Sequence, residues 1–138
     1  MPLVEAIKIE GLAQLNRSLR QLDGQAPVAL RLAGNEAARI VVDAARPMVP
    51  RQTGRAASTV RAASTRTSTR VSAGGKRAPY FPWLDYGGRV GRGKKTKRPF
   101  LSDGRYIYPA FRANRDQFER VLGDALRRVI TDAGLDVT

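Results

Sequence analysis

Residues 27–50 read PVALRLAGNEAARIVVDAARPMVP, and this stretch determines the layer against which the rest of the chain packs. Its apolar side chains recur at intervals of three or four residues, which is the period of an α-helix with one buried face. We expect that face to contain Leu30, Ala33, Ala37, Ile40, Val41, Ala44 and Met48. Pro27 suits the first turn, and Pro47 and Pro50 close the helix because proline lacks a backbone donor.

The same period predicts a short helix before this one and a long helix late in the chain. The short helix ends near Gly24 and carries Leu12, Leu15, Leu19 and Leu22. The late helix has Pro109 in its first turn and Gly134 at the position of a C-terminal cap. Its expected buried face contains Phe111, Phe118, Leu122, Ala125, Val129 and Ala133.

Strand patterns occupy the intervals between these helices. Weak alternation over residues 4–9 predicts a strand that Gly11 ends, and residues 59–61 and 69–72 predict two half-exposed strands joined by a turn near 66–68.

Further along, the aromatic stretch 80–86 is interpreted as a sheet strand that ends at Tyr86-Gly87. Asp103-Gly104 predicts a two-residue hairpin turn between two apolar pairs. The order of elements indicates an α+β fold, with an antiparallel sheet and long helices on one face. We expect a single domain over residues 1–138, because this length is typical of one domain.

A long basic, glycine-rich loop is expected over residues 87–99, GGRVGRGKKTKRP, and we expect it to be flexible because it has almost nothing to bury. Its cations are the candidate contacts with a partner or DNA: Arg89, Arg92, Lys94, Lys95, Lys97 and Arg98. Taken alone, they are suited to phosphates, to an acidic protein surface, or merely to water. Residues 88–95 resemble a phosphate-binding loop, but Lys95 stands where Ser or Thr must hold magnesium. We therefore expect no nucleotide cofactor.

The composition excludes several classes of function. The chain has no cysteine and no histidine, which removes disulfides, thiolate metal sites, and the commonest general base and metal ligand. We therefore expect no catalytic residues, no metal and no enzyme activity. No apolar run approaches the roughly 18 residues of a membrane helix, and the first residues lack the pattern of a signal peptide. We expect a soluble protein without a membrane partner.

The positive charge is concentrated in the middle of the chain. The 138 residues carry 25 basic and 12 acidic side chains, a net charge of +13. Residues 51–115 hold sixteen of the cations and only two carboxylates, Asp85 and Asp103, which gives this segment +14. The segments before and after it are nearly balanced. The middle of the chain is therefore expected to contact a partner.

Several short motifs occur in an order that resembles a known family. Residues 44–58, AARPMVPRQTGRAAS, look like the helix-end motif of that family, and residues 80–87, YFPWLDYG, look like its second motif. The opening IEGL at 9–12 and YPAF at 108–111 also fit. Together they resemble the tail-component family of long-tailed bacteriophages, whose members are small neck, head–tail connector and tail-completion proteins. Ala56 and Asp85 depart from the usual Leu and Glu of these motifs.

The resemblance implies a structural virion protein that joins the tail tube to the head or terminates the tail. It implies a homo-oligomeric ring, six-fold or twelve-fold, with other phage neck and tail proteins as partners and double-stranded DNA passing through the lumen. Such a protein would be assembled in the host cytoplasm. The matching residues are interpreted as fold residues rather than active-site residues: Pro50, Thr53, Gly54, Tyr80, Asp85, Tyr86 and Gly87. The alternative function is a small non-specific nucleic-acid-binding protein.

The amount of charge bears on what the ring would contact. A compact domain of this length is about 37 Å across, and about 22 phosphates of duplex DNA would lie within a ring of that height. At +14 each, the central segments of six copies would bring +84. Because this exceeds the phosphate charge several-fold, we expect most central cations to face acidic neighbouring proteins or subunits. At most the tips of the loop at 89–98 would reach the DNA.

Overall fold

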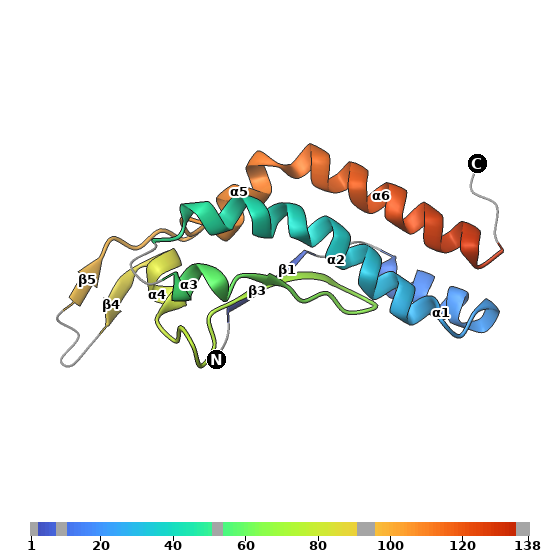
Figure 1. Ribbon diagram of the computed structural model, residues 1–138, viewed down its shortest axis with the longest axis horizontal. Coiled ribbons are helices and arrows are strands. Elements are labelled where there is room, and N and C mark those ends of the chain that lie inside the picture. The colour runs from blue at the N-terminus through green and yellow to red at the C-terminus, as the bar shows by residue number, and fades with distance from the viewer. Residues whose placement is uncertain (1–2, 8–10, 51–53, 91–95, 135–138) are drawn as a thin grey trace.

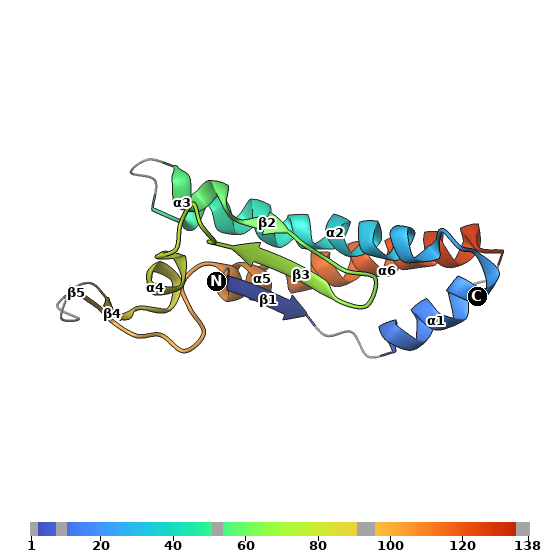
Figure 2. The same cartoon turned by 90° about the horizontal axis from the view of Figure 1, so that it is seen from below.

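The computed structural model describes residues 3–7, 11–50, 54–90 and 96–134. The elements in chain order are β1 (Leu3–Ile7), α1 (Leu12–Leu22), α2 (Ala26–Ala45), a 3-10 turn η1 (Arg46–Met48), α3 (Arg55–Ser58), β2 (Arg61–Ala62), β3 (Thr69–Ala73), α4 (Phe81–Tyr86), β4 (Gly88–Val90), β5 (Thr96–Arg98), α5 (Ile107–Ala113) and α6 (Arg115–Asp132). Helices α2 and α6 run side by side above the strands β1 and β3, in an elongated molecule (Figures 1 and 2). The predicted α+β class, with helices packed on an antiparallel sheet, is confirmed.

The main sheet has the order β1-β3-β2, with β3 in the centre and both neighbours antiparallel to it. Val71 and Ala73 of β3 join Ala37 and Val41 of α2 in the main apolar core. The backbones approach closely at Gly34, where an added Cβ would lie 3.0 Å from the Ser64 side chain. The glycine therefore lets α2 lie directly on the sheet.

A second apolar cluster lies where α1 meets α2 and α6. Leu12 and Leu19 of α1 pack with Leu30 of α2 and with Ala125 and Val129 of α6. The predicted short helix is therefore confirmed, and the spacing of its leucines locates the packed side. Leu22, the last of that series, is 58% exposed because the helix ends there.

Helix α2 also matches its prediction, except at its end. Ala33, Ala37 and Val41 of the predicted face are buried, but Met48 is 46% exposed. The α-helix gives way to a 3-10 turn at residues 46–48, whose three-residue repeat moves Met48 off the buried stripe. The prediction for Met48 was wrong for this reason.

The late helix is divided into α5 and α6 rather than continuous. Asn114 breaks it with φ −118° and ψ 18°, and its side chain donates a hydrogen bond to the Ala110 carbonyl oxygen at 2.8 Å. On either side of the break, Phe111 and Phe118 pack edge to face, with ring centroids 5.1 Å apart. Gly134 has the positive φ, 89°, expected of a residue that follows a helix.

The interpretation of residues 80–86 as a strand is wrong, because Phe81–Tyr86 form helix α4 with Pro82 in its first turn. The first motif was interpreted as a turn at Thr53 and Gly54 into a strand, and the structure differs at Gly54. Gly54 has φ 73° and precedes the short helix α3. Strand β3 is almost entirely buried rather than half-exposed, because it is the central strand of the sheet.

Two predictions around the basic segment are corrected. Within the expected loop at 87–99, Gly88–Val90 and Thr96–Arg98 form the antiparallel strands β4 and β5, in which position 89 pairs with 97, and residues 91–95 lie outside the described residues. The expected hairpin around Asp103-Gly104 does not form, because Tyr106 precedes helix α5 instead of entering a strand. Within the described ranges, no helix combines the length and apolar character needed to span a membrane.

Candidate interaction surface

The basic hairpin extends from one end of the molecule, and a buried carboxylate in α4 organises its base (Figure 1). Asp85 is 1% exposed. Its Oδ1 accepts hydrogen bonds from the backbone amides of Arg105 at 2.7 Å and Tyr106 at 2.9 Å. A buried carboxylate is tolerated only when hydrogen bonds replace its hydration. Asp85 therefore joins α4 to the segment that enters α5.

Arg105 and two glycines complete this junction. The Arg105 guanidinium donates to the backbone oxygens of Asp85, at 3.0 Å, and Pro99. Gly104 has φ 75°, and a Cβ there would lie 2.6 Å from Asp85 Oδ1. Gly87 has φ 89°, and a Cβ there would collide with the Pro99 carbonyl oxygen. Both positions therefore require glycine.

Arg98, predicted as a contact with a partner, is half-buried at the base of the hairpin. Its Nε donates to the Leu84 carbonyl oxygen at 3.1 Å, and one Nη donates to the Tyr106 hydroxyl at 2.9 Å. Its guanidinium also lies 5.7 Å from the centroid of the Trp83 ring, and the Trp83 indole donates to the Gly88 carbonyl oxygen at 3.1 Å. Through these contacts Arg98 fixes the base of the hairpin to α4 and to Tyr106.

The other predicted cations of this segment are placed only in part. Arg89 and Lys97 occupy paired positions of β4 and β5, while Arg92, Lys94 and Lys95 lie outside the described residues.

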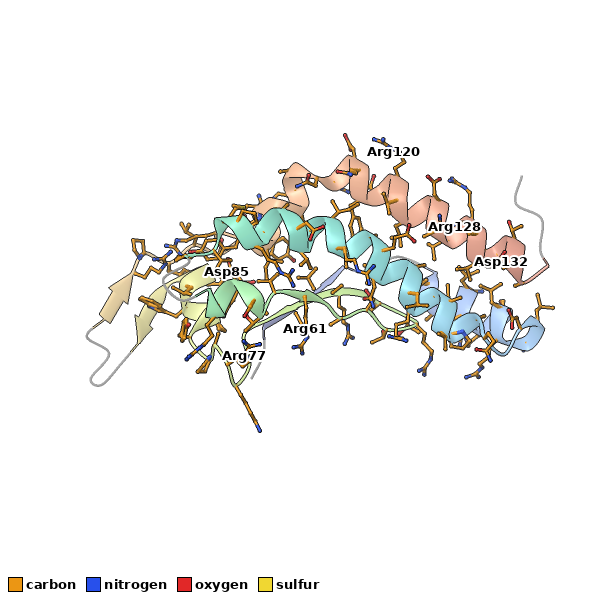
Figure 3. All side chains as sticks on the ribbon, in the orientation of Figure 1. Arg61, Arg77, Asp85, Arg120, Arg128 and Asp132 are labelled. Atoms are coloured by element: carbon orange, nitrogen blue, oxygen red, sulfur yellow. The ribbon has the colours of Figure 1, made fainter. Side chains whose placement is uncertain are left out.

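A second group of cations lies in residues 54–84, which the sequence analysis counted within the basic segment 51–115 without naming them as contact residues. Residues 54–84 contain no carboxylate but six cations: Arg55, Arg61, Arg66, Arg70, Lys76 and Arg77. Arg61 and Arg77 project away from the helical layer (Figure 3). These cations lie within a run of 41 residues, 44–84, that contains no Asp or Glu.

The helical layer, in contrast, has balanced charge. Helix α2 carries two basic and two acidic residues, and α6 carries four of each. Glu36 on α2 and Arg128 on α6 form an ion pair of 2.7 Å, and Arg127 pairs with Asp124 at 3.0 Å. The net positive charge is therefore segregated to the sheet and hairpin side.

The remaining motif residues that the structure describes lie next to η1 and α4. Pro50 is exposed just after η1, Tyr80 is 42% exposed just before α4, and Tyr86 is half-buried at its end. Thr53 lies outside the described residues. Among the side chains that the structure describes, no group of three or more acidic residues is arranged to hold a metal ion.

No protein-family model, no curated protein and no solved structure matches this chain. The segregated charge, the anchored hairpin and the motif resemblance are therefore the observations from which a function can be argued.

Proposed function

We propose that the chain is a structural virion protein of a tailed bacteriophage, which forms a ring at the head–tail junction or at the tail end and joins the tail tube to the head. The observation that carries the proposal is the charge segregation: cations gather on the sheet and hairpin side, while α2 and α6 are each neutral. A subunit that stacks on an acidic neighbour needs one strongly charged side. The ordered motifs of the tail-component family support the same role.

The proposed partners are further copies of the chain, in a six-fold or twelve-fold ring, and other neck and tail proteins. The carboxylate-free run of 54–84 would face acidic surfaces of these proteins, and the hairpin tips would approach DNA in the lumen. This role requires binding and assembly but no reaction. We therefore propose that the protein is not an enzyme and that it works in the virion.

Binding to purified tail tubes of the same phage tests the proposal. Negative-stain images should show the protein capping one end of the tubes. The double variant Arg61→Glu/Arg77→Glu, which reverses two cations on the sheet side, should reduce the capped fraction at least tenfold. Arg120→Glu is the matched control, because Arg120 projects from α6 on the opposite side (Figure 3). Absence of capping by the wild-type protein, or equal losses in both variants, would contradict the proposal.

Non-specific binding to nucleic acid is the second candidate, and the run 54–84 without carboxylates favours it. It requires that the isolated subunit bind duplex DNA with micromolar affinity or better and a steep dependence on salt. A salt titration of the monomer with a labelled duplex separates the two proposals. We expect the monomer to bind weakly, and tight binding without any association with tail tubes would favour this second candidate.

A further inference from the structure

Large apolar side chains are exposed at two separated places on the chain. One group, on α1 and the first turns of α2, consists of Leu22, Val28 and Leu32, with exposures of 58%, 46% and 53%. The other group includes Phe100 and Leu101, with exposures of 69% and 46%, in the segment between β5 and α5. Phe100 is the most exposed large apolar residue among those described.

Val28 of the first group lines a hollow of about 330 Å³, together with Pro27, Arg31, Ser64, Thr65 and Arg66. Its walls are the start of α2 and the turn between β2 and β3. Asn35 Oδ1 accepts from the Ser64 amide at 2.8 Å, and Thr65 Oγ1 accepts from the Ser68 amide at 3.1 Å. The first bond holds the turn against α2 and the second lies within the turn, so the hollow is formed before any partner arrives.

The second group is an apolar projection on a fixed backbone. The Leu101 amide donates to the Tyr86 carbonyl oxygen at 2.8 Å, and the Leu101 carbonyl oxygen accepts from the Gly104 amide at 3.0 Å. Arg105 additionally binds the Pro99 carbonyl oxygen. Phe100 is therefore held outward at little further cost in conformational entropy when it binds.

The projection and the hollow lie toward opposite ends of the molecule. The segment between β5 and α5 lies on the side of α4 and the hairpin, whereas the start of α2 lies beside α1 (Figures 1 and 2). Complementary sites at opposite ends produce head-to-tail contacts, which close into a ring when the rotation between subunits permits.

Charge also favours a second copy as the occupant. Arg31 and Arg66 line the hollow, whereas Asp103 follows Phe100 by three residues and its side chain is 67% exposed. It is the one exposed carboxylate in the segment 51–115, since Asp85 is buried. Its ion pair with Arg112, 3.1 Å in length, is exposed on both sides and thus weak. Asp103 can therefore turn to the arginines of a neighbour, and either arginine can stack on the Phe100 ring.

We propose that Phe100 of one subunit inserts into the hollow between α2 and the β2–β3 turn of the next subunit, with Asp103 directed toward Arg31 and Arg66. This inference rests on the proposed ring and identifies its subunit contact.

Engineered disulfides test the contact, because the natural chain has no cysteine. Phe100→Cys and Val28→Cys are made separately in the full chain, mixed and oxidised. The mixture should give a cross-linked dimer at least tenfold above either variant alone, and the double variant should give a ladder of linked chains. Phe100→Cys mixed with Arg120→Cys is the control, since Arg120 is exposed and projects from α6 on the side opposite the sheet (Figure 3).

The outcomes separate this inference from the proposed function. Equal cross-linking of Phe100→Cys with itself would indicate a symmetric contact and overturn the inference. A wild-type chain that assembles and caps tail tubes, while the mixed variants fail to cross-link, would overturn the contact but leave the function intact. A wild-type chain that neither assembles nor caps tubes would contradict both.

Discussion

Asp85 Oδ1 lies 2.7 Å from the backbone amide nitrogen of Arg105, twenty residues further along the chain. This contact determines where the segment after the hairpin turns back toward α5. It also explains why Gly104 must lack a Cβ, and it holds the backbone from which Phe100 projects. The position of the proposed subunit contact thus depends on one buried carboxylate.

Asp85→Ala should lower the free energy of unfolding by about 2 to 4 kcal/mol, because two backbone amides would lose their acceptor in a buried site. Urea denaturation followed by circular dichroism measures this loss. Asp103→Ala is the matched control. Loss of its exposed ion pair should change the free energy of unfolding by less than about 1 kcal/mol. Similar losses for the two variants would show that Asp85 does not organise the junction.

Gly34→Leu should destabilise the fold by about 1 to 3 kcal/mol, because the new side chain has no room between α2 and Ser64. Gly123→Ala, in the interior of α6, should instead stabilise by about 0.5 to 1 kcal/mol through helix propensity. There the new Cβ would meet only the end of the flexible Arg127 side chain, at 3.7 Å. Thermal unfolding of both variants compares the two sites, and a stabilised Gly34→Leu would refute the close packing.

Arg98→Ala should loosen the hairpin base without unfolding the protein, because it removes bonds to Leu84 and Tyr106 and the cation beside Trp83. Trp83 is the single tryptophan of the chain, so its fluorescence reports on this site alone. We expect a shift of the emission toward longer wavelength as the indole gains water. Lys76→Ala, at an exposed cation on the sheet side, should leave the spectrum unchanged. A shift of equal size in that variant would argue against the role of Arg98 at the base of the hairpin.

The proposed association of the protein with tail tubes should weaken as salt rises, whereas its folding should change little. Charges on exposed surfaces are screened within about 8 Å at physiological ionic strength, and the sheet-side cations are such charges. Co-sedimentation with tail tubes over a salt series measures the first effect, and thermal unfolding over the same series measures the second. If tube binding were insensitive to salt, the sheet-side cations would not take part in the contact.

Helices α1 and α2 could be predicted because the spacing of their own apolar residues specifies them. Helix α4 could not, since its aromatic residues favour strands and Pro82 is tolerated only because it lies in the first turn. Asp103-Gly104 is typical of a hairpin, but Asp85 binds the following amides and directs the chain into α5. Local sequence carries no information on that contact.

Only part of the candidate surface could be predicted, for the same reason. The basic segment is visible as a run of residues, but the role of Arg98 depends on Trp83 and Leu84 beside it. The hollow is lined by residues 27–31 of α2 and residues 64–66 of the β2–β3 turn, which are more than thirty residues apart in the chain. Only the fold brings them together.

The mass of the assembled particle tests the central claim most directly. Native mass spectrometry of the full chain, at concentrations where it caps tail tubes, should show one closed species of six or twelve copies of the 15.1 kDa subunit. A monomer at every concentration, or an open-ended series of masses, would contradict the account.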